Sequence, residues 1–418
     1  MTRHATSLAS GLALLFLQPA PSRAQVSELG ATLMSDKTAV AALERAKINE
    51  PEILAEQARL CEIAAPPYGE EKRGAELKNV FTRLGLKNVR VDAIGNVLGD
   101  RPGKNPKPHV VFAAHLDTVF PAETNVKVTK DGAWLRGPGI GDDCRGLAVV
   151  IGMIRALNEA SVVTEGSITF VANVGEEGLG DLRGTRALFG ETLKGQIDRF
   201  VSIDGTGLGM IDVGVGSFRY RLAYKGPGGH SYGAFGLVNP IHALGRAIAA
   251  ISEFQVGREP KTTFNVGRIG GGTSVNSIPF EAWAEVDMRS HDKASLDALH
   301  AKFIEAADAA AAAENKRWGN GTITVEKKSV GIRPPGHTPR TDYIVTAATA
   351  VTQALGFPVT WSQGSTDSNL PMSLGIPAIT IDGGGQGKDA HALTEAFDTT
   401  DSWKGTKRAV LLAIALAR

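Results

Sequence analysis

The chain has 418 residues, 43% of them hydrophobic and 21% charged, a globular composition that argues against disordered, collagen-like and coiled-coil proteins. At roughly 100–200 residues per domain, this length predicts two or three structural units with sizeable cores. Because 45 Lys and Arg residues nearly balance 44 Asp and Glu residues and only 6% of the residues are aromatic, we expect no nucleic-acid partner.

The first 24 residues have the pattern of a secretory signal peptide. Arg3 and His4 form a short basic start, the mostly apolar run 8–17 follows, and Ser22-Arg23-Ala24 fits a small-x-small cleavage site. The apolar run is too short to span a membrane, and a mobile N-terminal helix is the alternative. We therefore expect a periplasmic or secreted protein without membrane association once residues 1–24 are removed.

From about residue 40 to residue 213, apolar runs typical of buried strands alternate with helical stretches. This alternation predicts an α/β fold in which a mostly parallel sheet is covered by helices. The predicted strands are 109–115, 167–174 and 199–204, and the predicted helices are 51–64 and 147–160.

Residues 217 to 330 follow the order β-α-β-β-α-β, which is typical of a ferredoxin-like α+β unit. The predicted strands are 217–225, 262–269, 280–289 and 322–330, and the predicted helices are 240–253 and 293–314. After the linker Pro334-Pro335-Gly336, the first pattern returns with a helix at 342–355 and a strand at 378–382. The sequence therefore predicts an α/β domain in two segments, 25–215 and 333–418, interrupted by an inserted domain at 216–332.

Polar side chains gather at the ends of the predicted strands, where open α/β sheets bind their ligands. They are His115 and Asp117 after the first strand, Asp142 and Asp143 on a glycine-rich loop, Glu176 and Glu177 after the second strand, Asp204 after the third, and His391 after the loop 383–387. Charges this close to a sheet core carry a large desolvation cost unless they bind a cation. By itself, a His-x-Asp motif is usually a local hydrogen-bonded pair, and a Glu-Glu pair usually lies in a solvated turn. The occurrence of all these residues at successive strand ends predicts a metal site.

The chain resembles the co-catalytic di-zinc metallohydrolases that include glutamate carboxypeptidase, aminoacylase, acetylornithine deacetylase and tripeptide aminopeptidase. The resemblance runs from about Ile48 to the C-terminus and includes PPYGEE at 66–71, His115-Leu116-Asp117, GPGIGDDCRG at 137–146, Glu176-Glu177, Asp204, GGHS at 228–231, Asn276, Asp287–Arg289 and His391. It implies that the inserted ferredoxin-like domain is a lid and dimerisation domain, and hence that the protein is a homodimer. It also implies two Zn²⁺ ions as cofactors, with Co²⁺ or Mn²⁺ as substitutes.

The resemblance assigns a metal ligand to each of five positions. Asp142 would bridge the two ions, His115 and Asp204 would complete the shell of one ion, and Glu177 and His391 would complete the shell of the other. Nitrogen and carboxylate ligands suit zinc and leave space for a shared water.

Further roles implied by the resemblance concern the reaction itself. Asp117 would hold the imidazole of the preceding histidine ligand by its second nitrogen. Glu176 would be the general base that takes a proton from the shared water and delivers it to the leaving amine. His230 would stabilise the oxyanion in the partner's site, while Asn276 and Arg289 would hold the substrate carboxylate or carbonyl. Without the resemblance, His230 is equally a turn histidine and Arg289 equally a surface ion-pair partner.

The sequence departs from the family pattern at Cys144, because the family usually has a Lys two residues after the bridging Asp. Alignment on Gly146 still assigns the bridge to Asp142 rather than Asp143. Cys144 is either a thiol close to the metal or a packed thiol. We expect the packed thiol, with Cys61 also buried and unpaired.

The acid at position 204 indicates the class of substrate. An aspartate there resembles the tripeptidase and dipeptidase branch of the family, so we predict a zinc-dependent exopeptidase that hydrolyses short peptides. An N-acyl amino acid hydrolase with the same site is the first alternative, and a non-catalytic metal-binding or peptide-binding protein is the second. Whether the enzyme acts from the amino or the carboxyl end stays open.

Overall fold

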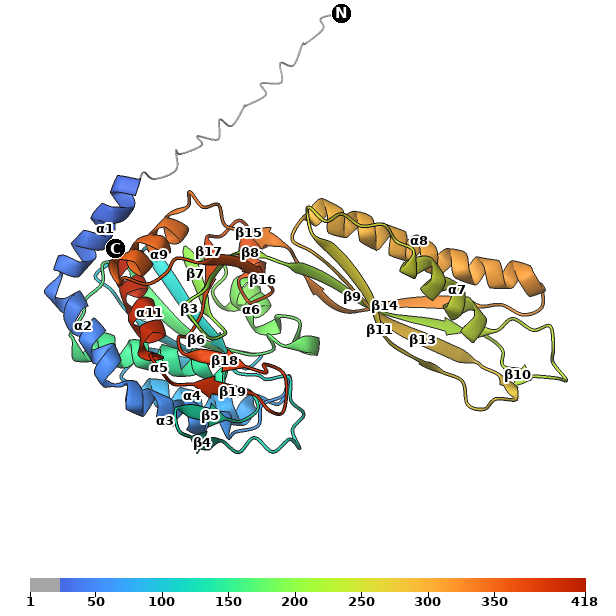
Figure 1. The fold of residues 1–418 in the computed structure, drawn as a ribbon, viewed down its shortest axis with the longest axis horizontal. Coiled ribbons are helices and arrows are strands. Elements are labelled where there is room, and N and C mark those ends of the chain that lie inside the picture. The colour runs from blue at the N-terminus through green and yellow to red at the C-terminus, as the bar shows by residue number, and fades with distance from the viewer. Residues whose placement is uncertain (1–22) are drawn as a thin grey trace, which may run out of the picture.

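The computed structural model of the protein describes residues 23–418. The expected signal peptide, residues 1–24, therefore lies outside the described residues except for its last two positions. The described chain forms two bodies that lie one after the other along the long axis of the molecule (Figure 1). Within residues 23–418, the structure has no helix that is both long and apolar enough to cross a bilayer.

The first body is built on a nine-stranded sheet with the order β1-β2-β6-β3-β7-β17-β8-β15, and β16 pairs with β8. Its strands are β1 (Lys87–Val91), β2 (Val97–Arg101), β3 (His109–His115), β6 (Ser167–Asn173), β7 (Arg199–Ile203), β8 (Met210–Gly214), β15 (Gly336–His337), β16 (Trp361–Gly364) and β17 (Ala378–Ile381). The central strands β6, β3, β7 and β17 are parallel, whereas β2 and β8 are antiparallel to the strands that they flank. The parallel α/β sheet expected from the sequence is confirmed at its centre, and the antiparallel outer strands make the whole sheet mixed.

Helices cover both faces of this sheet because its central strands are apolar on both sides. The larger core includes residues from α1 (Arg23–Ser35), α2 (Lys37–Ile48), α3 (Glu50–Cys61), α4 (Glu71–Arg83), α5 (Cys144–Glu159), α9 (Tyr343–Ala354) and α11 (Trp403–Leu416). The smaller core includes residues from η2 (Leu188–Thr192) and α10 (Asn369–Ser373), together with Leu182, which caps α6 (Arg183–Ala187). The short helix η1 (Gly178–Gly180) precedes them in the chain. Along β3, Phe112 contributes to the larger core and Val111 to the smaller, as the two-residue period of a strand requires.

A small four-stranded sheet in the first body joins two segments that lie far apart in the sequence. Its strands are β4 (Thr129–Asp131), β5 (Trp134–Arg136), β18 (Gln386–Lys388) and β19 (Ala396–Asp398), in the order β18-β19-β5-β4. This sheet brings the loop 137–146 next to the segment around His391. None of these strands is predicted from the sequence, because each has only three residues and two of them are wholly exposed.

The second body is a ferredoxin-like unit, as the sequence predicts. Its antiparallel sheet has the order β11-β13-β9-β14 and consists of β9 (Gly216–Lys225), β11 (Thr262–Gly271), β13 (Glu281–Ser290) and β14 (Thr324–Arg333). The helices α7 (Pro240–Ser252) and α8 (Lys293–Trp318) cover one face, and the short strands β10 (Gly229–His230) and β12 (Ser277–Ile278) pair beside the sheet. Along β13, Ala284 and Val286 pack in the core with the helices, while Trp283, Glu285 and Asp287 lie on the opposite, open face.

The stability of the second body depends on the packing of α8 against its sheet. Phe303 of α8 is fully buried, and its ring lies 5.4 Å from the ring of Tyr220 on β9. We expect Phe303→Ala to lower the free energy of unfolding by about 3–5 kcal/mol, because the surrounding core cannot fill the cavity. Urea denaturation of the purified chain, followed by circular dichroism, measures this loss.

Phe280 provides a matched control because its side chain is 61% exposed. Phe280→Ala should change the free energy of unfolding by no more than about 0.5 kcal/mol. Equal losses in the two variants would contradict the assignment of Phe303 to the core.

Candidate metal centre

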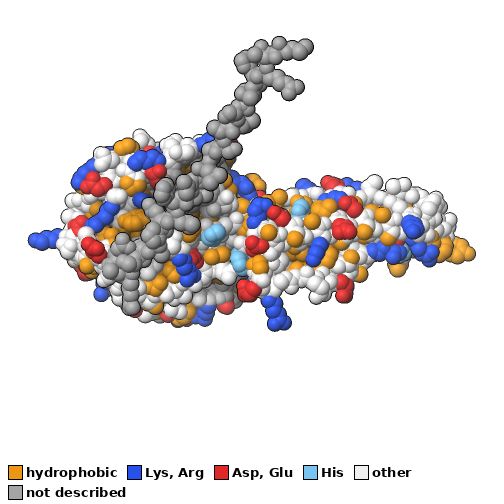
Figure 2. Space-filling model, turned by 90° about the horizontal axis from the view of Figure 1, so that it is seen from above, with side chains coloured by type: hydrophobic (Ala, Val, Ile, Leu, Met, Phe, Trp, Pro, Cys, Tyr) orange, Lys and Arg blue, Asp and Glu red, His pale blue; other side chains and the backbone are white. Residues whose placement is uncertain are grey.

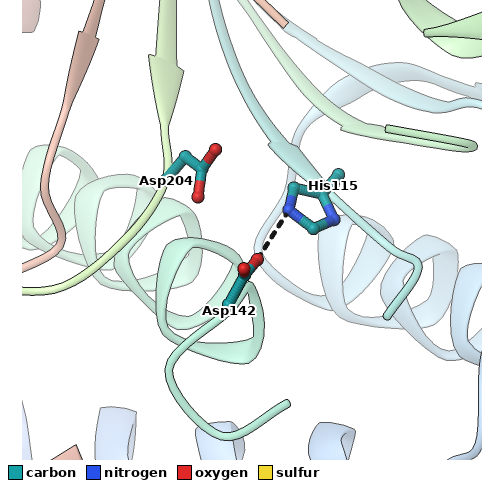
Figure 3. A group of neighbouring side chains, drawn as sticks. All are labelled: His115, Asp142 and Asp204. Atoms are coloured by element: carbon teal, nitrogen blue, oxygen red, sulfur yellow. Dashed lines mark hydrogen bonds and ion pairs between the residues drawn. The ribbon is translucent and has the colours of Figure 1, made fainter. Parts of the chain in front are cut away.

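The polar side chains at the strand ends meet at one edge of the central sheet. His115 ends β3, Glu176 and Glu177 follow β6, Asp204 follows β7, Asp142 lies on the loop before α5, and His391 follows β18. Figure 3 shows His115, Asp142 and Asp204 turned toward one another from three separate elements. They converge because β6, β3 and β7 are parallel, so that their carboxyl ends lie at the same edge.

The five predicted metal ligands form two adjacent groups that share one carboxylate. In each group, His115-Asp142-Asp204 and Asp142-Glu177-His391, the candidate ligand atoms lie within 4.8 Å of one another. The Oδ1 atom of Asp142 lies 3.1 Å from His115 Nε2, and its Oδ2 atom lies 3.0 Å from His391 Nε2. The Oε1 atom of Glu177 lies 2.9 Å from His391 Nε2. The geometry therefore gives Asp142 the position of a bridge between two sites.

The electrostatics of this cluster fit a pair of divalent cations. Burial, together with the charge of Asp142, raises the pKa of Asp204 to about 7. The hydrogen bonds to Asp142 and Glu177 raise the pKa of His391 to about 10. Negative charge gathered in one place raises the pKa of a carboxylate and of a histidine alike, as it does here. Cations bound between these groups would neutralise that charge. Imidazole and carboxylate donors are the ligands that zinc and similar divalent ions take in catalytic sites.

Asp117 holds both His115, one of the candidate metal ligands, and the turn that carries the two glutamates. The nearest atom of Asp117 to His115 Nδ1 is its backbone oxygen, at 2.9 Å, and its Oδ1 atom lies 3.5 Å away. The carboxylate accepts the backbone N–H groups of Glu176, at 3.0 Å, and Glu177, at 2.8 Å. The predicted orientation of the imidazole is thus made mainly by the backbone, and the side chain fixes the positions of the glutamates.

Asp143 is turned away from the two metal-ligand groups. Its Oδ2 atom accepts the backbone N–H of His115 at 3.0 Å, and its Oδ1 atom accepts the N–H of Gly146 at 3.0 Å as the N-cap of α5. The peptide bond between Asp142 and Asp143 is cis. Asp143 therefore joins the end of β3 to the start of α5, which leaves Asp142 as the carboxylate that faces both histidines.

Cys144 belongs to a small apolar cluster and lies outside the candidate metal-ligand groups of the described residues. It packs in this cluster with Cys61, and both thiols are buried and unpaired. The Sγ atom of Cys61 donates to the backbone oxygen of Pro138 at 3.4 Å. These contacts are those of packed thiols, which is the alternative that the sequence favours.

Arg333 contacts the predicted general base and has no counterpart among the residues singled out from the sequence. It ends β14, is nearly fully buried, and donates from Nη1 to Glu176 Oε1 at 2.7 Å; its Nη2 donates to the backbone oxygen of Glu176. Burial and the charge of Glu177 raise the pKa of Glu176 well above its usual range, although Arg333 opposes this shift. A raised pKa suits a carboxylate that takes up a proton and later releases it. In the sequence, the only feature that distinguishes Arg333 is its position directly before the predicted linker 334–336.

Glu395 is a second buried residue that sequence reasoning misses. Its Oε1 atom accepts the backbone N–H groups of Gly141, at 2.8 Å, and Asp142, at 3.1 Å, while Oε2 accepts the N–H of Gly139 at 2.9 Å. Glu395 lies four residues after His391 in the chain. It therefore connects the loop of the bridging carboxylate with the segment of the second histidine.

The three residues predicted to bind substrate lie at opposite ends of the second body. Arg289 is on the open face of β13, and its Nε donates to Asp287 Oδ2 at 2.7 Å. His230 is in β10, at the end of the second body that points away from the first (Figure 1). Asn276 is beside it, since its backbone oxygen accepts the N–H of Ser231 at 3.0 Å. Within one chain, His230 and Asn276 are therefore exposed and remote from the metal-ligand groups.

Comparisons with known proteins agree with this arrangement. The profile of peptidase family M20/M25/M40 matches residues 111–415. The chain is 27% identical over 353 residues to the uncharacterized protein YqjE of Bacillus subtilis. The alignment covers 80% of this chain and 90% of YqjE. A tripeptidase from Staphylococcus aureus has a similar fold, with a TM-score of 0.73 and 24% identity over 88% of this chain and 99% of that one. So does YxeP of Bacillus subtilis, described as a dinuclear metal binding peptidase, with a TM-score of 0.65 and 18% identity over 88% of this chain and 98% of that one.

Metal uptake should release protons from the cluster. His391 carries a proton at pH 7 when only Asp142 and Glu177 face it, because its pKa is raised to about 10. A histidine ligand must be neutral, so Zn²⁺ binding to chelator-treated protein displaces this proton, and the affinity should fall as the pH is lowered. Isothermal titration calorimetry at pH 7, in buffers of different ionisation enthalpy, counts the protons released.

His391→Gln should release about one proton fewer than the unmodified protein, since it removes the displaced proton together with its ligand. His242→Gln alters an exposed histidine of α7 and should leave the count unchanged. If His391→Gln and the unmodified protein release equal numbers of protons, His391 is not a metal ligand that is protonated beforehand.

Proposed function

The chain belongs to peptidase family M20/M25/M40, and on that basis we propose that it is a two-metal exopeptidase that hydrolyses short peptides. The observation that carries this proposal is the pair of metal-ligand groups that share Asp142. The fold shared with a solved tripeptidase supports short peptides as substrates. We propose zinc as the ion, because two imidazoles and three carboxylates are donors that zinc prefers.

The protein's own residues prepare the site for hydrolysis. Two ions held by the shared groups would polarise the scissile carbonyl and lower the pKa of a water molecule. Glu176 takes a proton from the attacking water and delivers it to the amine that leaves. Arg333 holds one carboxylate oxygen of Glu176, and Asp117 fixes its backbone, so the base keeps its orientation before the substrate arrives. Burial of this carboxylate keeps competing water away from the proton.

Metal removal and loss of the base test the proposal separately. Exhaustive chelation should abolish the release of amino acids from dipeptides and tripeptides, and Zn²⁺ or Co²⁺ should restore it. Glu176→Gln keeps the shape of the side chain but cannot take a proton, so we expect kcat to fall by about 10²–10⁴-fold. Bound metal, measured by elemental analysis, should be unchanged in this variant.

Glu191→Gln provides the control, because Glu191 is an exposed acid outside the metal-ligand groups. This variant should keep full activity. Full activity of the unmodified protein after metal removal would refute the proposal. Turnover of N-acetyl or N-carbamoyl amino acids alone would replace it with the deacylase alternative, and the absence of turnover on any amide would favour a binding protein.

We propose further that the chain forms a homodimer through the second body. Hydrophobic side chains are visible at the outer tip of this body (Figure 2), and Tyr232 and Phe235, which follow β10, are 89% and 78% exposed. An exposed apolar patch of this kind marks a protein interface. His230 and Asn276 lie in the same region, and a second copy would give them a metal centre to reach.

Light scattering of the purified protein tests the dimer. We expect twice the mass of one chain, and the double substitution Tyr232→Ser and Phe235→Ser should shift the protein toward a monomer. Leu374→Ser alters an exposed leucine of the first body and should leave the mass unchanged. A monomeric mass for the unmodified protein at all concentrations would contradict the proposal.

A further inference from the structure

The turn that carries the two glutamates of the metal centre continues into a contact with the second body. After Glu177, the chain passes through η1 and reaches Asp181, whose Oδ1 atom accepts the backbone N–H of Ile332 at 2.8 Å. Arg186 donates from Nη2 to the backbone oxygen of Ile332, and from Nε to the backbone oxygen of Asp181 at 2.8 Å. Side chains of the first body therefore hold both backbone polar groups of Ile332.

Ile332 offers these two groups because of its place in the sheet. It lies on β14, which is the last strand in the order β11-β13-β9-β14. In an antiparallel pair, every second residue turns its N–H and C=O away from the neighbouring strand, and on an outer strand these groups face outward. Asp181 and Arg186 thus supply the hydrogen-bond partners that a further strand would supply.

The backbone of Asp181 and Leu182 shows that the surroundings impose the shape of this turn. Both residues are left-handed, with φ angles of 49° and 58°. Residues other than glycine cost free energy in this conformation, and two in succession persist only when contacts on each side hold them. Leu182 is fully buried in the smaller core, while the side chain of Asp181 is bonded to Ile332. The turn is thus anchored in the first body at one residue and attached to the second body at the residue before it.

The residue after Ile332 holds the proposed general base. Arg333 donates from Nη1 to Glu176 Oε1 at 2.7 Å, and from Nη2 to the backbone oxygen of Glu176. Adjacent Cα atoms are about 3.8 Å apart, so a shift of Ile332 is passed on to Arg333. Two consecutive residues of β14 therefore bind both ends of the segment 176–181, Arg333 at its start and Ile332 at its end.

We propose that Asp181 is a positioning residue for Glu176 and acts through the end of β14. The carboxylate of Asp181 fixes the backbone of Ile332, and the next residue, Arg333, fixes the carboxylate that takes the proton. Asp181 itself lies outside the metal-ligand groups of the described residues. This inference rests on the proposed peptidase function and adds to it a residue on which the orientation of the base depends.

Asp181→Ala removes the acceptor for the Ile332 N–H, whereas Asp181→Asn keeps one in its amide oxygen and tolerates the left-handed backbone. For the metal-loaded full-length enzyme acting on Ala-Ala, we expect kcat to fall by about 10–100-fold in Asp181→Ala, because the base is misplaced. KM should change by less than about twofold, since no group that binds the substrate is removed. Asp181→Asn should recover most of kcat, and thermal melts verify that each variant folds.

Two further variants separate the carboxylate from other effects of the substitution. Asp181→Gly removes the carboxylate but favours the left-handed backbone, so it should lose kcat as Asp181→Ala does. Asp308→Ala is the matched control, because Asp308 on α8 forms an ion pair with Lys327 on the same strand, β14. This variant should keep kcat unchanged.

Amide hydrogen exchange, followed by mass spectrometry, separates this inference from the proposed function because it needs no turnover. In Asp181→Ala, the segments 330–333 and 175–178 should both exchange about five- to tenfold faster than in the unmodified protein. Asp181→Asn and Asp308→Ala should leave both rates unchanged.

Each combination of exchange rates and kcat gives a decision on the inference. If both segments keep their exchange rates in Asp181→Ala, the inference is overturned. If the rates rise but kcat does not fall, Asp181 joins the two bodies without positioning the base; the inference is again overturned, and the peptidase function stands. If no peptide is hydrolysed but both segments exchange faster, the peptidase function fails, while the coupling of Asp181 to the segment that carries Glu176 stands.

Discussion

The architecture of the site follows from the cost of burying several carboxylates at one edge of a sheet. The structure meets this cost in two ways. Asp117, Asp143 and Glu395 each accept two or three backbone N–H groups, which offset part of the cost of burying them. Asp142 and Asp204 lack such a set of backbone donors within the described residues and face imidazoles or other acids. The acids that lack backbone donors are thus separated from the acids that hold the loops in place.

The convergence of the candidate metal ligands could be predicted from the sequence because most of them have a local signal. His115, Glu177 and Asp204 follow buried apolar strands, and parallel strands place their carboxyl ends at one edge whatever the details of packing. The choice of Asp142 over Asp143 came from aligning Gly146 with the family pattern, and the structure gives a physical reason for it, because Asp143 is the N-cap of α5. Chain order and the strand pattern were therefore sufficient to gather these residues at one edge of the sheet, whereas the resemblance to the family supplied their division between two ions. The ferredoxin-like order of the second body could be predicted from the pattern of strands and helices alone.

The contacts of Arg333 and Glu395 could not be read in this way because they form only in the folded chain. Arg333 and Glu176 are separated by 157 residues, and Glu395 bonds to N–H groups more than 250 residues before it. The strands that bring Glu395 into place have three residues each, too few for a period-two pattern to stand out. Similarly, an outer strand such as β2 has the same apolar character whether it runs parallel or antiparallel, so its direction depends on tertiary packing.

The position of Arg333 joins the two bodies chemically as well as covalently. It is the last residue of β14, one of the two strands that connect the second body to the first (Figure 1), and its guanidinium holds Glu176, the proposed general base. On the neighbouring strand β9, Arg219 contacts Gly178 in the turn that follows this base. A rotation of the second body would therefore move both arginines relative to Glu176.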